Sequence, residues 1–438
     1  MAVAHKNTNF VEFKSARKPR DAFADGSWKD PKTEGPLGQI RWRGMSTKSV
    51  AAYAGVNRGD DGKMAVTPLF TGTTPPTLTC DELGARFADT VHSGRTGMIY
   101  PRLGSEDTFE LECALVGVHG SFRPGDAMVF GSGMAAISHA LLPLLTAGDN
   151  LVSHKNLYGC TDNLLRIQLP NMGFATRYTD FTDPKNVAKA IDNRTRAVYF
   201  ETPSNPVLDL IDIAKVVEAT KGRCPVIVDN TFASPLGQNP FEQGAHIVIY
   251  SLTKSIGGHA DAIGGAVLGS GTFLEHLFYI RKDFGGIMAA REATEFVKGI
   301  HTLPLRYRQM QKNAKLVARM LRGHTEISRV YYPEFDRLYP LGGQMKGPGY
   351  MIAFELKKGL EGAKKMIDGL QMIVHAVSLG GVFSLISNPA SSTHFCVGPE
   401  QRMEAGISDG LVRISVGVEN VGEVIGDLKQ ALAKVKML

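Results

Sequence analysis

The sequence predicts an α/β protein built around a mostly parallel sheet, and two observations support this prediction. Short apolar runs lie at 127–130, 150–153, 196–200, 225–229 and 246–250, with helical patterns between several of them. Strands that are apolar at every position are typical of a parallel sheet covered by helices on both faces. The runs end in small or polar residues, and ligands bind beyond the carboxyl ends of strands in such sheets.

Helical patterns and a change of character along the chain predict its organisation. We expect helices at 108–117, 134–145 and 213–221. After about residue 300 the pattern predicts a basic amphipathic helix at 306–322, strands at 350–355 and 411–416, and a last helix at 421–436. Residues 1 to about 95 are polar and predict an extended arm that needs another surface to order it. We therefore expect an N-terminal arm at 1–103, a large domain at 104–299 and a small α/β domain at 300–438.

Composition narrows the classes of protein that the chain can belong to. The net charge of +6 comes without interleaved basic and aromatic residues, so we expect no nucleic-acid partner. No run of about 18 apolar residues occurs, so we expect no membrane partner. The five cysteines are dispersed without a CxxC pair, which predicts reduced thiols and a cytoplasmic protein. They are Cys80, Cys113, Cys160, Cys224 and Cys396.

Polar side chains gather where the predicted strands end, and together they predict a site. The set consists of Ser132, Tyr158, Glu201, Asn205, Asp229, Ser251 and Lys254. Lys254 stands among hydroxyls and glycines without a neighbouring acid in the sequence. It is either a solvated loop lysine or a desolvated amine that can attack carbonyls.

Two further features bear on this choice. Gly131-Ser-Gly133 precedes a helix, where free backbone N–H groups bind phosphate, although a tight turn explains the glycines equally well. Asp229 is either a turn residue or the partner of a buried cation. A phosphate cradle, a carboxylate and an amine nucleophile together suit pyridoxal phosphate, the cofactor that we predict.

Six motifs in the sequence carry a resemblance to a known family. They are Gly131-Ser-Gly-Met-Ala-Ala-Ile137, Leu157-Tyr-Gly-Cys-Thr161, Glu201-Thr-Pro-Ser-Asn-Pro206, Val228-Asp-Asn-Thr-Phe232, Ser251-Leu-Thr-Lys254 and Val377-Ser-Leu-Gly-Gly381. From about Tyr100 to its C-terminus the chain resembles the Cys/Met-metabolism family of pyridoxal-phosphate enzymes. The resemblance implies the PLP-dependent transferase fold type I, with a mostly parallel seven-stranded sheet in the large domain.

The resemblance also implies roles for the site residues. Lys254 would bind the cofactor aldehyde covalently and move protons, Asp229 would pair with the pyridine nitrogen, and Tyr158 would stack on the ring and act as acid and base. Two groups would bind phosphate within one chain: the amides of Gly133 and Met134, and the hydroxyls of Ser251 and Thr253. The substrate carboxylate would be held by Arg413 and Asn205, with help from the backbone of Ser378. We expect no metal, and we expect His259 and Asp261 to be structural, because no third ligand is evident near them in the sequence.

The implied assembly is a homotetramer made of two dimers, with active sites at the dimer interface. In this arrangement Tyr100 and Arg102 would reach the phosphate of a neighbouring subunit. The family pattern usually continues with Asn-Pro-Thr after this pair, whereas this chain has Ser105-Glu-Asp107, which leaves the shape of the substrate entrance open.

Three positions indicate the subtype. Val377 stands where cystathionine enzymes often have glutamate, which favours a short or apolar substrate side chain. Cys160 follows Tyr158-Gly as in many methionine γ-lyases, where a Lys-Asp pair resembling Lys282-Asp283 forms a network with that cysteine. A solvated helix end explains Lys282-Asp283 in another way, and a small buried filler explains Cys160.

Together these residues predict α,γ-elimination of a sulfur amino acid, with methionine giving 2-oxobutanoate, ammonia and methanethiol. Three alternatives stay open. One is γ-replacement on an O-acyl-homoserine, as in sulfhydrylases and cystathionine γ-synthases. Another is elimination from a different γ-substituted amino acid such as cystathionine or canavanine. The third is a non-catalytic scaffold that binds the cofactor or a partner.

Overall fold

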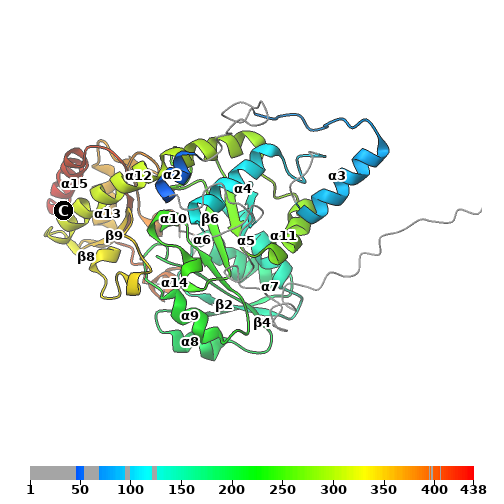
Figure 1. Ribbon diagram of the computed structural model, residues 1–438. Helices are drawn as coiled ribbons and strands as arrows, with labels where there is room; N and C mark the ends of the chain where they lie inside the picture. Colours follow the sequence, from blue (N-terminus) through cyan, green and yellow to red (C-terminus); the bar gives the residue numbers. More distant parts are fainter. Residues whose placement is uncertain are drawn as a thin grey trace, which may run out of the picture.

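The chain forms two sheets joined by one long helix, as Figure 1 shows for the computed structural model. The structure describes residues 46–53, 69–93, 99–120, 126–393, 395, 398–404 and 406–438. In these ranges, no helix is both long enough and apolar enough to cross a bilayer.

The first sheet has seven strands in the order β1-β7-β6-β5-β4-β2-β3. Its strands are β1 (Ala127–Phe130), β2 (Asn150–His154), β3 (Ala175–Thr179), β4 (Thr195–Glu201), β5 (Val226–Asp229), β6 (Ile247–Ser251) and β7 (Gly265–Leu268). Only β7 runs against its neighbours, since it pairs antiparallel with both β1 and β6. The remaining pairs are parallel. The predicted parallel sheet with buried strands is confirmed.

Helices cover both faces of this sheet. The α-helices between residues 106 and 284 are α4 (Glu106–His119), α5 (Gly133–Leu141), α6 (Gly159–Asn163), α7 (Leu169–Asn171), α8 (Pro184–Ala190), α9 (Ile213–Thr220), α10 (Ser234–Gly237) and α11 (Gly271–Phe284). Short 3₁₀ turns lie at η1 (Leu142–Leu144) and η3 (Pro240–Gln243), and η2 (Leu164–Gln168) is a π-helix. The helix expected at 134–145 therefore ends at Leu141, because Pro143 lacks the N–H of a continuing helix.

The N-terminal part contains helices where we expected extended chain. These are α2 (Thr47–Ala52) and α3 (Cys80–Ser93). Ser46 caps α2, since its side chain accepts the N–H of Ser49, and α2 packs on α4. α3 lies at the edge of the molecule opposite the second sheet (Figure 1). Residues 1–45 of the predicted arm lie outside the described residues.

The helix α12 (Ala290–Arg322) connects the two sheets. We expected a helix only at 306–322, but the structure continues it N-terminally through Pro304. The proposed boundary between residues 299 and 300 falls inside α12, so the division into domains stays a prediction.

The second sheet has five strands in the order β10-β11-β12-β9-β8. They are β8 (Ile327–Tyr331), β9 (Met351–Leu356), β10 (Val374–His375), β11 (Leu385–Ser387) and β12 (Leu411–Ser415). All pairs except β10–β11 are antiparallel, which agrees with the expected mixed or antiparallel sheet. The accompanying helices are α13 (Gly359–Asp368), α14 (Pro399–Glu404) and α15 (Val421–Lys436), with 3₁₀ turns η4 (Pro333–Phe335), η5 (Leu341–Gly343) and η6 (Pro389–Ser391).

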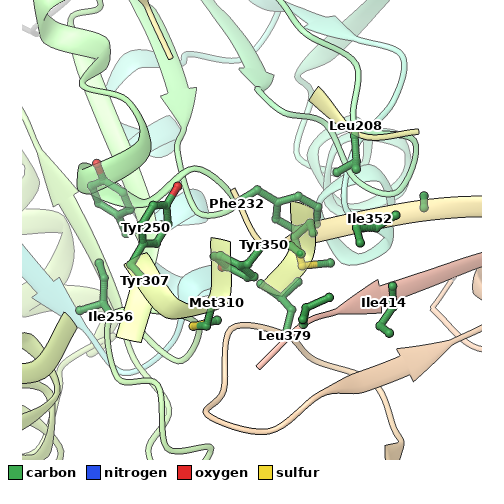
Figure 2. Close-up of a cluster of buried hydrophobic side chains, with 14 of the residues drawn as sticks. Leu208, Phe232, Tyr250, Ile256, Tyr307, Met310, Tyr350, Ile352, Leu379 and Ile414 are labelled. Atoms are coloured by element: carbon green, nitrogen blue, oxygen red, sulfur yellow. The ribbon is translucent and has the colours of Figure 1, made fainter. Parts of the chain in front are cut away.

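One hydrophobic cluster runs from the first sheet to the second through α12. It includes Tyr250 of β6, Met310 of α12 and Ile414 of β12, all buried. Figure 2 shows Met310 between Tyr250 and Ile256 on one side and Ile352 and Ile414 on the other. Because apolar burial is the main favourable term in folding, this shared core holds the two sheets together.

Candidate active site

A cavity of about 550 Å³ opens where the two sheets meet. It lies beyond the carboxyl ends of β5 and β6, where Asp229 and Ser251 stand, and β12 contributes Arg413 from the second sheet. Twelve of the predicted site residues line it, and Ser132 and Glu201 from the strand ends do so as well. The twelve are Gly133, Met134, Tyr158, Cys160, Asn205, Asp229, Ser251, Thr253, Lys254, Val377, Ser378 and Arg413.

Lys254 lies in the turn that follows β6. Its Nζ donates a hydrogen bond to Oγ of Ser378 at 2.9 Å. No ion pair to Lys254 occurs among the residues that the structure describes, which matches its lack of acidic sequence neighbours. Burial, and secondarily the positive charge of Arg413, lowers the pKa of Lys254 from 10.5 to about 8. A neutral amine is therefore accessible near physiological pH, as a nucleophile requires.

Asp229 and Glu201 are register partners at the ends of the parallel strands β5 and β4. Asp229 accepts the N–H of Thr231 at 3.0 Å. Burial raises the pKa of both carboxyls, and Asp229 raises that of Glu201 further. Two buried carboxylates side by side are costly without a cation, so a cationic ring nitrogen beside Asp229 would stabilise the charged form.

Tyr158 precedes α6, and its backbone N–H donates to Oε1 of Glu201 at 2.7 Å. Its hydroxyl accepts the thiol of Cys160 at 3.4 Å. Burial and then this thiol raise the pKa of Tyr158 to about 12. The phenol therefore keeps its proton at neutral pH and can donate it.

The N-terminus of α5 forms a cradle at the end of β1. Ser132 caps the helix by accepting the N–H of Ala135 at 3.0 Å, while the cavity lies beside Gly133 and Met134. A Cβ on Gly133 would lie 2.9 Å from Cβ of Ser251, so the helix and β6 approach only because residue 133 is glycine. Free N–H groups, the helix dipole and the Ser251 hydroxyl make this a suitable phosphate site.

Arg413 on β12 is buried and lies beside Lys254. Its Nη1 donates to Oδ1 of Asn205 at 2.7 Å, and its Nη2 donates to the carbonyl of Ser378 at 3.4 Å. Burial lowers the pKa of Arg413 to about 10, so the guanidinium stays charged at neutral pH. Ser378 has a φ of +94°, a strained value for a residue with a side chain, and such strain is concentrated at functional sites.

Four predicted residues lie away from this cavity. Arg102 donates to the carbonyl of Lys282 at 2.9 Å and lies over the ring of Tyr100. Lys282 pairs with Asp283 at 3.3 Å, and the cavity lining contains Cys160 but neither of these two residues. One chain therefore does not assemble the predicted network with Cys160. The roles of Tyr100 and Arg102 at a neighbouring subunit stay predictions.

The segment Ser105-Glu-Asp107, which replaces the family's Asn-Pro-Thr, lies at the start of a helix. Ser105 caps α4 in a capping box with Thr108, and Asp107 is buried against Thr294. None of these residues lines the cavity.

Sequence reasoning missed several contributors to the site. Thr231 connects two strand ends, since its hydroxyl accepts the N–H of Ser251 at 2.8 Å while its own N–H binds Asp229. Its position two residues after Asp229 was the available signal. Thr393 and Ile263 also line the cavity, and no signal in the single sequence marks them.

These residues fit pyridoxal phosphate. Gly133 leaves room for a phosphate, Asp229 offers a buried carboxylate, and Lys254 offers an amine with a lowered pKa and no acidic partner in the described chain. The fold and the site together define a pyridoxal-phosphate-dependent enzyme of fold type I.

Comparison with known proteins defines the family. The model of the Cys/Met metabolism PLP-dependent enzymes matches residues 48–433. An L-methionine gamma-lyase of Fusobacterium nucleatum subsp. polymorphum is 39% identical over 88% of this chain and 98% of its own length. An O-acetyl-L-homoserine sulfhydrylase of Leptospira meyeri is 34% identical over 92% of this chain and 100% of its own. The crystal structure of cystathionine gamma synthase from Xanthomonas oryzae pv. oryzae, in complex with aminoacrylate and cysteine, is 33% identical with a TM-score of 0.82, covering 90% of this chain and 99% of that one. The chain belongs to the Cys/Met-metabolism family of pyridoxal-phosphate-dependent enzymes.

Proposed function

We propose that this enzyme is a carbon–sulfur lyase that catalyses α,γ-elimination, with L-methionine as the substrate. Methionine and water give 2-oxobutanoate, ammonia and methanethiol. One observation carries the choice of substrate: the charged residues of the cavity lining, within the described chain, are Glu201, Asp229, Lys254 and Arg413. We assign Lys254 and Asp229 to the cofactor and Arg413 to the substrate carboxylate, while Glu201 accepts the backbone N–H of Tyr158.

The far side of the cavity suits an uncharged γ-substituent. Val377 and Ile263 at the rim are more than half exposed and apolar, and Cys160 donates its thiol hydrogen to the Tyr158 hydroxyl. A distal ammonium or carboxylate, as in cystathionine, would meet no complementary charge there. The relatives named L-methionine gamma-lyase support the same choice.

Each chemical role falls to a residue whose state suits it. Pyridoxal phosphate, when bound, supplies an electron sink for the carbon acids of the substrate. Arg413 binds the substrate carboxylate through its planar fork, beside Asn205. Lys254, with its lowered pKa, takes the proton from Cα and moves protons at neighbouring carbons. Tyr158 keeps its proton and gives it to the departing γ-sulfur.

A second candidate is γ-replacement on an O-acyl-homoserine. The similarity to the Leptospira sulfhydrylase over that protein's whole length favours it. Elimination and replacement begin with the same proton transfers at Cα and Cβ, so the residues described above can catalyse either reaction. The two reactions differ in whether a nucleophile adds at Cγ.

A substrate panel separates these reactions. The purified chain is assayed for 2-oxobutanoate with methionine, homocysteine, cystathionine, canavanine and O-acetylhomoserine, each with and without added thiol. Lys254→Ala is the inactive control. We expect 2-oxobutanoate from methionine without a thiol. No keto acid from methionine, together with a thioether from the ester plus thiol, would refute the proposal in favour of replacement.

We further propose a cytoplasmic homotetramer with active sites at the dimer interfaces. The support is the position of Tyr100 and Arg102 outside the chain's own cavity, where they are available to a neighbour's phosphate. Cys80, Cys160 and Cys224 are free thiols, which fits a reducing compartment. Sedimentation analysis of the native protein tests the assembly.

A further inference from the structure

Arg306 is a buried arginine of α12 that binds backbone carbonyls. Its Nη1 donates to the carbonyl of Ser255 at 2.8 Å, and its Nη2 donates to the carbonyls of Ile256 at 3.1 Å and Gly299 at 2.6 Å. Its Nε donates to the hydroxyl of Thr302 at 3.0 Å. No carboxylate forms an ion pair with it within the part of the chain that the structure describes. Burying a charge in this way is costly, so the contacts that it makes require an explanation.

The carbonyls that Arg306 binds follow Lys254 directly. Elsewhere in this turn the backbone bonds to itself: the N–H of Gly257 binds the carbonyl of Leu252, and the N–H of Gly258 binds that of Lys254, each at 2.8 Å. The carbonyls of Ser255 and Ile256 receive their donors from Arg306 instead. The turn that carries Lys254 is therefore completed by a side chain from another element.

Two glycines allow this close approach. A Cβ on Gly299 would lie 2.6 Å from the carbonyls of Ile256 and Gly257, so α12 packs directly on the turn. A Cβ on Gly258 would overlap the guanidinium of Arg306. Gly258 also has a φ of +76°, which favours glycine. The space beside the turn is shaped for the arginine.

Geometry points to Arg306 as a positioning residue for Lys254: it holds the backbone of residues 254–258 and so fixes the direction from which the amine enters the cavity. Because α12 also packs on β8 and β9, the same contact ties Lys254 to the sheet that carries Arg413. The inference rests on the proposed role of Lys254 in binding the cofactor. It does not require methionine to be the substrate.

The test compares two buried side chains of the same helix. Arg306→Met removes the donors to the lysine turn. Asn313→Leu is the matched control, since Asn313 is also buried on α12 and donates to two backbone carbonyls, those of Gly417 and Glu419. Arg306→Lys keeps the charge with fewer donors. Gly258→Ala perturbs the same contact from the other side and replaces Arg306→Met if that variant does not fold.

Two readouts on the cofactor-loaded protein avoid dependence on turnover. Hydrogen exchange of a peptide covering residues 252–258 reports the turn, and a spectrophotometric pH titration of the bound cofactor reports its lysine linkage. In Arg306→Met we expect exchange at Gly257 and Gly258 to accelerate about tenfold or more, as loss of hydrogen bonds to a charged group implies. We also expect a displaced titration midpoint, an intermediate effect in Arg306→Lys, and neither change in Asn313→Leu.

Kinetic measurements then distinguish a loss of Lys254 positioning from a general loss of structure. We expect Arg306→Met to lower kcat far more than it changes KM, because Arg413 and Asn205 still bind the substrate. Wild-type exchange in the turn of Arg306→Met, or an equal acceleration in Asn313→Leu, would overturn the inference. A wild-type protein inactive on methionine would refute the proposed function alone, since the exchange and titration measurements need only the bound cofactor.

Discussion

Replacing Arg413 with methionine perturbs two properties that the structure links. Arg413 is 3% exposed, and its guanidinium donates to Asn205 and to the carbonyl of Ser378, so it forms a preorganised, desolvated site for a carboxylate. Losing one partner of a buried charge pair costs about 3–5 kcal/mol, which corresponds to about 10²–10⁴-fold in kcat/KM. Arg413→Lys keeps the charge but loses the fork, and we expect it to recover only part of the loss.

The same substitution changes the acidity of Lys254. Burial is the first cause of its lowered pKa and the charge of Arg413 is the second, so Arg413→Met raises the pKa above 8. Removing a like charge from beside the amine favours its protonated form, which fixes the direction of this change. The assay is keto-acid release from methionine, combined with the rate of pyridoxal phosphate capture by the cofactor-free protein at several pH values. The reasoning fails if kcat/KM stays within about threefold of wild type and the capture profile does not move.

Two other predictions follow from the cradle and from the amine. Gly133→Ala places a methyl group 2.9 Å from Cβ of Ser251 and 3.3 Å from its Cα, so we expect weaker cofactor affinity, measured by equilibrium dialysis. Gly426→Ala in α15 meets no atom within 4 Å and serves as the control that should bind normally. For the wild type without cofactor, we expect capture of pyridoxal phosphate to rise with pH to a midpoint near 8, because the neutral amine reacts. At pH 7.5 about a quarter of Lys254 would be neutral, about 250-fold more than for a lysine of ordinary pKa, and a midpoint near 10.5 would contradict the assignment.

Parallel-sheet patterning explains why much of the site could be predicted from the sequence. Asp229, Ser251 and Glu201 end fully apolar runs, and the carboxyl ends of parallel strands meet at one edge. The strand β3 could not be predicted in the same way, because Ala175–Thr179 lies at the edge of the sheet and stays partly exposed. A continuous apolar run, which is the sequence signal for a buried strand, is absent from β3.

The sequence pattern could not predict contacts between elements that are distant along the chain. A proline inside a helix usually ends or kinks it, yet α12 continues through Pro304, with buried core residues of the helix on both sides of the proline. Arg306 reads as one more cation of a basic amphipathic helix, and only the packing of α12 on the lysine turn reveals what it binds. This hydrogen bond joins two segments that are fifty residues apart along the chain. The spacing of residues within either segment therefore cannot predict it.

The pairing of Ser251 with Gly265 has a consequence for how the enzyme can diversify. The segment between them, which holds Lys254, leaves the sheet and returns to it at neighbouring positions on β6 and β7. The surrounding strands therefore constrain only its two ends, and α12 holds residues 255–258. The exposed stretch 259–261 can gain, lose or exchange residues while the sheet closes as before. Natural variation and laboratory evolution can therefore change residues near Lys254 without changing the fold. The condition is that each new segment keeps the two carbonyls that Arg306 of α12 binds.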